Sequence, residues 1–103
     1  MKLPYNLSGL GYTAPVASKM IDGALFLVPS NDHLPRHLHV LIGDIAIIVD
    51  LLPGGLVQLS DRKDAKRPLN AKKSDVKKGL RLAKKNHSTL VALWEGVHGN
   101  KTN

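Results

Sequence analysis

The chain has 103 residues, of which 43% are hydrophobic and only 4% aromatic; it lacks cysteine and carries a formal net charge of +7. This length and apolar content predict one globular domain with a modest aliphatic core and exclude a wholly disordered chain, while the missing cysteine excludes disulfides, thiolate nucleophiles and cysteine-ligated zinc. No apolar run is long enough to span a bilayer and no signal-peptide core is visible, so we expect a cytoplasmic protein that does not enter a membrane.

The first 60 residues divide into an irregular part and a part rich in short apolar runs. Residues 1–20 carry prolines and glycines without a period, which predicts an irregular N-terminal arm. Residues 21–60 contain the strands, because short apolar runs there end at turn-forming residues. The expected strands are 24–28, 37–42, 45–52 and 56–59. Short links favour antiparallel hairpins, and the almost wholly apolar third run predicts a central strand.

The remaining residues change first to a basic loop and then to a helical period. Residues 61–71 are polar, charged and broken by Pro68. Residues 72–98 are expected to be helical, interrupted near 86–89, because apolar side chains recur at steps of four and three. The stripe consists of Val76, Leu80, Ala83, His87, Leu90, Trp94 and Val97. The chain therefore predicts a single α+β domain: an antiparallel meander of three or four strands packed on a C-terminal helix or a broken helix pair.

Three of the five histidines cluster at the start of the second expected strand, at His33, His37 and His39. Residues two apart in a strand share a face, so His37 and His39 should project side by side, with His33 on the preceding turn. Two imidazoles can supply the base and the acid that cleave an RNA phosphodiester, and Arg36 could stabilise charge on the phosphate. These four residues are the candidate catalytic residues of a metal-independent ribonuclease.

Two alternatives explain the same histidines. Three imidazoles can also hold Zn²⁺ in a site with one open position, whereas the lack of carboxylates other than Asp32 argues against a carboxylate-rich magnesium site. Alternatively, the histidines are only polar residues on an exposed strand face, because short motifs often match by chance. His87 and Trp94 lie on the apolar stripe, where we expect a half-buried histidine and a core residue. His98 is expected to meet the helix dipole or solvent near the helix end, and neither histidine is assigned a function.

The positive charge is regional, since residues 62–85 carry eleven lysines and arginines against Asp64 and Asp75, a net charge of +9. Within the expected helix, Lys73, Lys77, Arg81 and Lys84 form one stripe that Lys78 and Lys85 broaden. Such a cationic ridge suits a phosphate backbone, but it lacks the interleaved aromatics that would stack on bases. The alternative is a solvated, lysine-rich helix face.

The segment Asp32-His33-x-Pro35-x-His37-x-His39-Val40 resembles a small bacterial family of unknown function whose core is His-x-Pro-Pro-His-Phe-His-Val. The family's helix ending, Leu-x-x-x-Trp-Glu, is similar to Leu90–Glu95 here, and the resemblance covers about the last three quarters of the chain. All three histidines match, while Arg36 replaces the second proline and Leu38 replaces the aromatic residue. Genes of this family often neighbour a second small gene, so the resemblance implies a toxin-like protein neutralised by an antitoxin-like partner.

These observations lead to one main hypothesis and two alternatives. The main hypothesis is a toxin-like protein that binds RNA through the basic helix and cleaves it through the histidine cluster. The first alternative is a non-catalytic basic module that binds nucleic acid or an acidic partner protein. The second is a protein whose histidines bind a metal. No cofactor is otherwise expected.

Overall fold

The computed structural model describes residues 17–31 and 33–99. In chain order its elements are β1 (Ala17–Ile21), β2 (Ala24–Val28), β3 (Arg36–Ile42), β4 (Ile45–Leu51), a 3-10 turn (Pro53–Gly55), β5 (Val57–Leu59), β6 (Lys66–Arg67), α1 (Lys73–Lys85) and α2 (His87–His98). The prediction of an α+β fold with an antiparallel meander is confirmed, and so is the break in the helical region.

The strands form one antiparallel sheet in the order β1-β2-β3-β4-β5, with β6 paired to β4 beyond the end of β5. Every residue of β4 is buried, which confirms the central place predicted from its apolar sequence. Two-residue turns join β1 to β2 and β3 to β4, and positive φ angles at Asp22, Gly23 and Gly43 suit such tight hairpins. Because the Gly43–Asp44 turn sets Ile42 opposite Ile45, the register further along the hairpin places His37 opposite Asp50.

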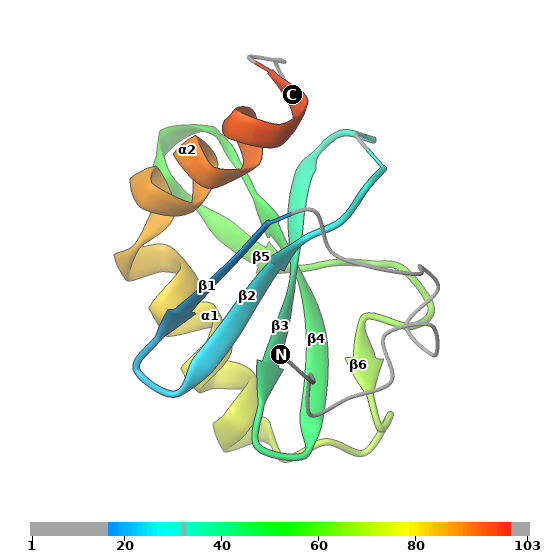
Figure 1. Cartoon of the computed structure of the whole chain (residues 1–103). Coiled ribbons are helices and arrows are strands. Elements are labelled where there is room, and N and C mark those ends of the chain that lie inside the picture. Colours follow the sequence, from blue (N-terminus) through cyan, green and yellow to red (C-terminus); the bar gives the residue numbers. More distant parts are fainter. Residues whose placement is uncertain (1–16, 32, 100–103) are drawn as a thin grey trace.

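Both helices pack on the same face of the sheet, as Figure 1 shows, and they meet at Asn86. The core between sheet and helices takes alternate residues of β2, β3 and β4 together with the apolar sides of α1 and α2. Its buried members are Ala24, Phe26, Val28, Leu38, Val40, Ile42, Ile45, Ile47, Val49, Leu51, Leu82, Ala83, Leu90 and Trp94. The intervening residues of the same strands therefore point to the face of the sheet away from the helices.

The structure has more strands than the sequence predicts. The apolar runs predict three or four, and the described residues form six. β1 occupies the end of the predicted irregular arm, where pairing with the apolar β2 gives these residues a regular structure; residues 1–16 of that arm lie outside the described residues. β6 lies inside the predicted basic loop, because Lys66 and Arg67 pair with the open part of β4. In the described chain, neither helix has the length and apolarity needed to cross a membrane.

Gly79 marks the closest approach of α1 to the sheet. A Cβ atom at this position would lie 2.7 Å from Cδ1 of Ile47 and 3.1 Å from Cδ1 of Ile42. We therefore expect Gly79→Ala to destabilise the protein by about 1 kcal/mol in urea unfolding, because overpacking outweighs the gain in helix propensity. Gly96→Ala is the matched control on α2: nothing lies within 4 Å of its Cβ position, so it should stabilise by up to about 1 kcal/mol. Shifts of the same sign in the two variants would contradict this packing.

Candidate functional site

His37 and His39 lie on the same face of β3, as predicted, with ring centroids 6.3 Å apart. This is the face of the sheet that points away from α1 and α2, because the intervening residues Leu38 and Val40 belong to the helix-side core. The two imidazoles are not surface groups, since His37 is 0% and His39 5% exposed. A phosphodiester in solution therefore has no direct access to them in this conformation.

The His37 ring makes a hydrogen bond between Nδ1 and the backbone oxygen of Pro35 at 3.2 Å, and the His33 backbone makes a further hydrogen bond to His37. The carbonyl can only accept, so Nδ1 carries the proton and Nε2 offers a lone pair. Nε2 is buried and has no hydrogen-bond partner among the described residues. Burial lowers the pKa of His37, and the nearby Arg62 charge lowers this pKa further, against smaller opposing effects from the Pro35 hydrogen bond and Asp50.

His39 is more strongly affected. Burial, reinforced by the neighbouring His37, lowers the pKa of His39 to about 4, although Asp64 opposes the shift. Both rings are consequently neutral at pH 7. Acid–base cleavage of RNA needs one imidazole as base and a second, protonated one as acid, and the pair does not supply the protonated member at that pH.

Polar and charged side chains lie near the two histidines, and the sequence did not predict them at this place. Asp50 lies opposite His37 on β4 and is 4% exposed; its Oδ2 accepts a hydrogen bond of 3.0 Å from the Gln58 side chain on β5. The loop between β5 and β6 adds the charges of Arg62 and Asp64. Asp50 could have been found in the sequence, because it is the only charged residue in an otherwise apolar strand.

Arg36 does not join the histidines, which corrects its assignment beside them. As the neighbour of His37 in a strand it points to the opposite face, where its Nη2 donates to Glu95 Oε2 at 2.9 Å. Its guanidinium also lies 5.6 Å from the centroid of the Trp94 ring. Arg36 thus links the start of β3 to Trp94 and Glu95 of α2, and it packs on the side of the sheet that the helices cover.

The side chains of the other three histidines lie apart from the pair, although the His33 backbone makes a hydrogen bond that raises the pKa of His37. His33 lies on the turn before β3, as predicted, but its side chain is exposed. His87 Nε2 bonds to the Leu52 carbonyl at 2.7 Å, and His98 Nε2 bonds to the Pro29 carbonyl at 2.8 Å while its ring lies 4.6 Å from that of Trp94. The contacts of His87 and His98 hold the helices to the residues that follow β4 and β2. For His98 this differs from the expected contact with the helix dipole or solvent, because its ring packs on Trp94.

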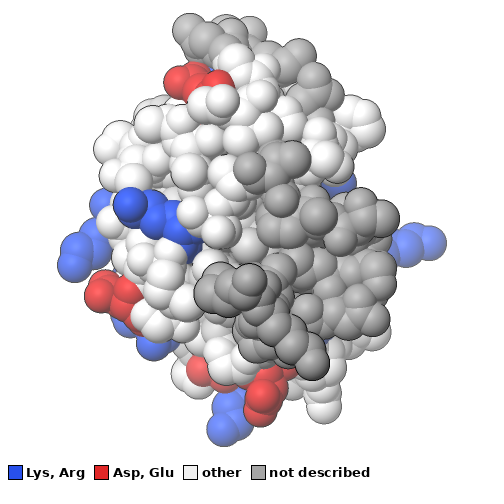
Figure 2. Space-filling model, in the orientation of Figure 1, with Lys and Arg blue, Asp and Glu red and all other residues white. Residues whose placement is uncertain are grey.

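The predicted basic ridge forms on α1. Five of its six members, Lys73, Lys77, Arg81, Lys84 and Lys85, are exposed, and Lys78 is half-buried. Within residues 17–31 and 33–99, none of the six forms an ion pair. In Figure 2, lysine and arginine side chains appear along the margin on the side where Figure 1 places α1 and β1.

The ridge and the histidine pair lie on opposite faces of the sheet. The α1 helix packs on the side of Ile42 and Ile47, whereas His37 and His39 project to the other side. RNA that is bound along the ridge alone would therefore not reach the imidazoles. Among the residues that the structure describes, no group of three or more His, Asp or Glu side chains is arranged to hold a metal ion.

Comparison with known proteins adds no assignment. No family model matches the chain, and no curated protein and no solved structure is significantly similar to it.

Proposed function

We propose that the chain is a non-catalytic binding module that holds RNA by its phosphate backbone on the exposed face of α1, in the cytoplasm. The observation that carries this proposal is the row of exposed α1 cations, none of which forms an ion pair with a described carboxylate. Lys73, Lys77 and Arg81 follow each other at steps of four, about one cation for each helical turn of 5.4 Å. Such a row contacts successive phosphates without reading bases.

The histidine pair supports the non-catalytic form of this function. Both imidazoles are buried and neutral at pH 7, and they face away from α1. In this proposal they are structural residues of the sheet, and the phosphate-binding surface works without them. RNA incubated with the protein should stay intact; cleavage that is lost in both His37→Gln and His39→Gln would instead favour the ribonuclease hypothesis.

An acidic partner protein of the antitoxin kind is the alternative occupant of the same face of α1. The described residues favour RNA because the cations are regularly spaced along one helix and because every exposed residue of α1 is polar or charged. Protein interfaces, by contrast, usually bury an apolar centre within a polar rim.

The test is the salt dependence of binding to a labelled 12-nucleotide oligouridine, followed by fluorescence anisotropy. Arg81→Glu should weaken binding at least tenfold at low salt and reduce the slope of log K against log salt by about 0.7, the value for one lost contact to a single strand. Arg62→Glu is the charge-matched control, because Arg62 is exposed and its charge acts on His37, on the face of the sheet away from α1. Equal losses in the two variants would mean that net charge alone drives binding and would contradict a site on α1.

A further inference from the structure

A second feature adjoins the basic ridge and is not explained by it. A hollow of about 460 Å³ lies beside β6, lined among the described residues by Lys63, Asp64, Lys66, Arg67, Pro68 and Leu69. Only five residues separate Arg67, the last residue of β6, from Lys73, the first residue of α1. The hollow therefore lies where the chain leads directly into the basic ridge.

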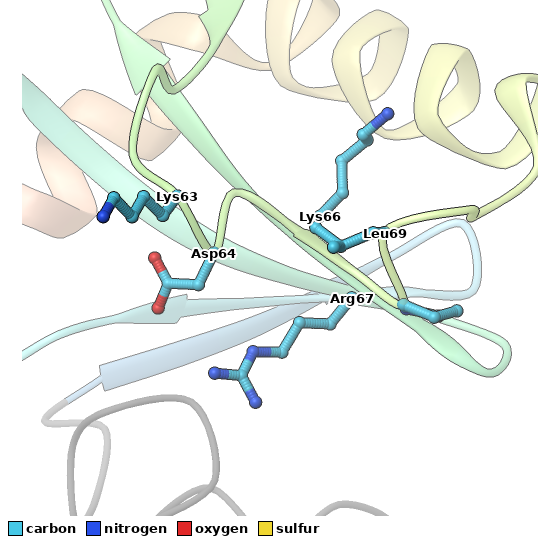
Figure 3. Close-up of a pocket in the computed structure, with 6 residues that line it drawn as sticks. Lys63, Asp64, Lys66, Arg67 and Leu69 are labelled. Carbon is cyan, nitrogen blue, oxygen red and sulfur yellow. The ribbon is translucent and has the colours of Figure 1, made fainter.

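The cations around the hollow do not converge on one point. Lys66 pairs with Ile47 and so lies on the helix side of the sheet, whereas Arg67 pairs with Ala46 and lies on the other side. Figure 3 shows the same divergence, with Lys66 projecting toward α1 and Arg67 away from it. A single small anion cannot contact both side chains, but successive phosphates of a long anion can.

Unlike the exposed face of α1, the hollow is also lined by apolar side chains and a carboxylate. Leu69 is 74% exposed, although it is a large apolar side chain, and the exposed Pro68 lies next to it. Asp64 adds a carboxylate, which accepts hydrogen bonds and repels a neighbouring carboxylate. Together these groups fit a nucleotide: the apolar side chains can contact its base, the carboxylate can accept from an amino group or the 2′-hydroxyl, and the cations can contact its phosphates. They fit an acidic peptide less well.

We propose that this hollow binds one unstacked nucleotide of a single-stranded RNA whose backbone continues along α1. The base lies against Leu69 and Pro68, Asp64 accepts a hydrogen bond from the base or the ribose, and Arg67 and Lys66 contact the phosphates on either side. A duplex keeps its bases stacked, so it would use the ridge on α1 but not the hollow. This inference rests on the proposed RNA binding and adds to it a preference for single strands.

The experiment compares a labelled 12-nucleotide single strand with a 12-base-pair RNA duplex, using the full chain. Leu69→Ser should weaken binding of the single strand about fivefold without changing the salt slope, since it removes an apolar contact and no charge, and it should leave duplex binding unchanged. Leu56→Ser is the matched control, because Leu56 is also exposed, at 55%, but lies in the turn before β5. Arg67→Gln should reduce the slope for the single strand by about 0.7, and Lys19→Gln should not.

The outcomes separate this inference from the proposed function. Wild-type affinity in Leu69→Ser, together with weakened binding in Arg81→Glu, would overturn the nucleotide site and leave the α1 surface standing. Equal weakening of single strand and duplex in Leu69→Ser would also overturn it, because a backbone contact would then explain the loss. Absence of RNA binding by the wild type at low salt, or tighter binding of polyglutamate than of RNA, would overturn both.

Discussion

Trp94→Ala is expected to lower the free energy of unfolding by about 3–5 kcal/mol, the range for truncating a large aromatic side chain in a core. Trp94 is 0% exposed and belongs to the core between the sheet and the helices. Its truncation would leave a cavity at the junction of α2 with β3, and it would remove the ring that lies beside both Arg36 and His98. Urea unfolding followed by far-UV circular dichroism measures the loss, because the variant lacks the chain's only tryptophan fluorophore.

Trp94→Phe distinguishes the volume of the ring from its polar group. The indole Nε1 is buried and has no hydrogen-bond partner among the described residues, so replacing the indole by a phenyl ring removes no hydrogen bond to them. We expect this variant to lose less than half as much stability as Trp94→Ala. Equal losses in the two variants would show that the indole makes a polar contact, and a loss under about 1 kcal/mol in Trp94→Ala would contradict the central place of this residue in the core.

The fold was largely predictable because its signals are local. Each central strand is a short apolar run bounded by turn residues, and the helical stripe changes period at residue 72. The strands β1 and β6 were not predicted, and this has a physical cause. The strand β1 has exposed residues at its centre, and β6 has only two residues, both cationic, so neither carries a hydrophobic pattern; their pairing depends on the partners β2 and β4.

The candidate site was predictable only in part. Alternation along a strand correctly placed His37 and His39 together, and the same rule applied to Arg36 puts it on the opposite face. Counting outward from the Gly43–Asp44 turn would have paired His37 with Asp50. The contact of Arg36 with Glu95 joins residues 59 positions apart, and no periodicity in the sequence connects them.

Burial of the two histidines predicts a protein that is sensitive to mild acid. Because the pKa of His39 is lowered to about 4 in the folded state, from 6.5 in an unfolded chain, the unfolded state binds the proton first as the pH falls. The folded state is therefore favoured fully above pH 6.5 and loses stability between pH 6.5 and 4, with no further loss from this group below pH 4. The expected loss from His39 is about 3 kcal/mol, and His37, whose pKa is lowered too, adds to it in the same direction.

The pH profile of His39→Gln isolates this contribution, because glutamine keeps a polar side chain but has no titrating group in this range. Urea unfolding of both proteins at several pH values between 7.5 and 4 should give curves that are parallel above pH 7. Below that, the wild type should lose about 3 kcal/mol more than the variant, whereas protonation of carboxylates affects both alike. Profiles that stay parallel to pH 4 would mean that His39 takes up its proton as readily in the folded chain as in the unfolded one. A surface-exposed imidazole would behave in that way, and the catalytic hypothesis for the pair would then regain its basis.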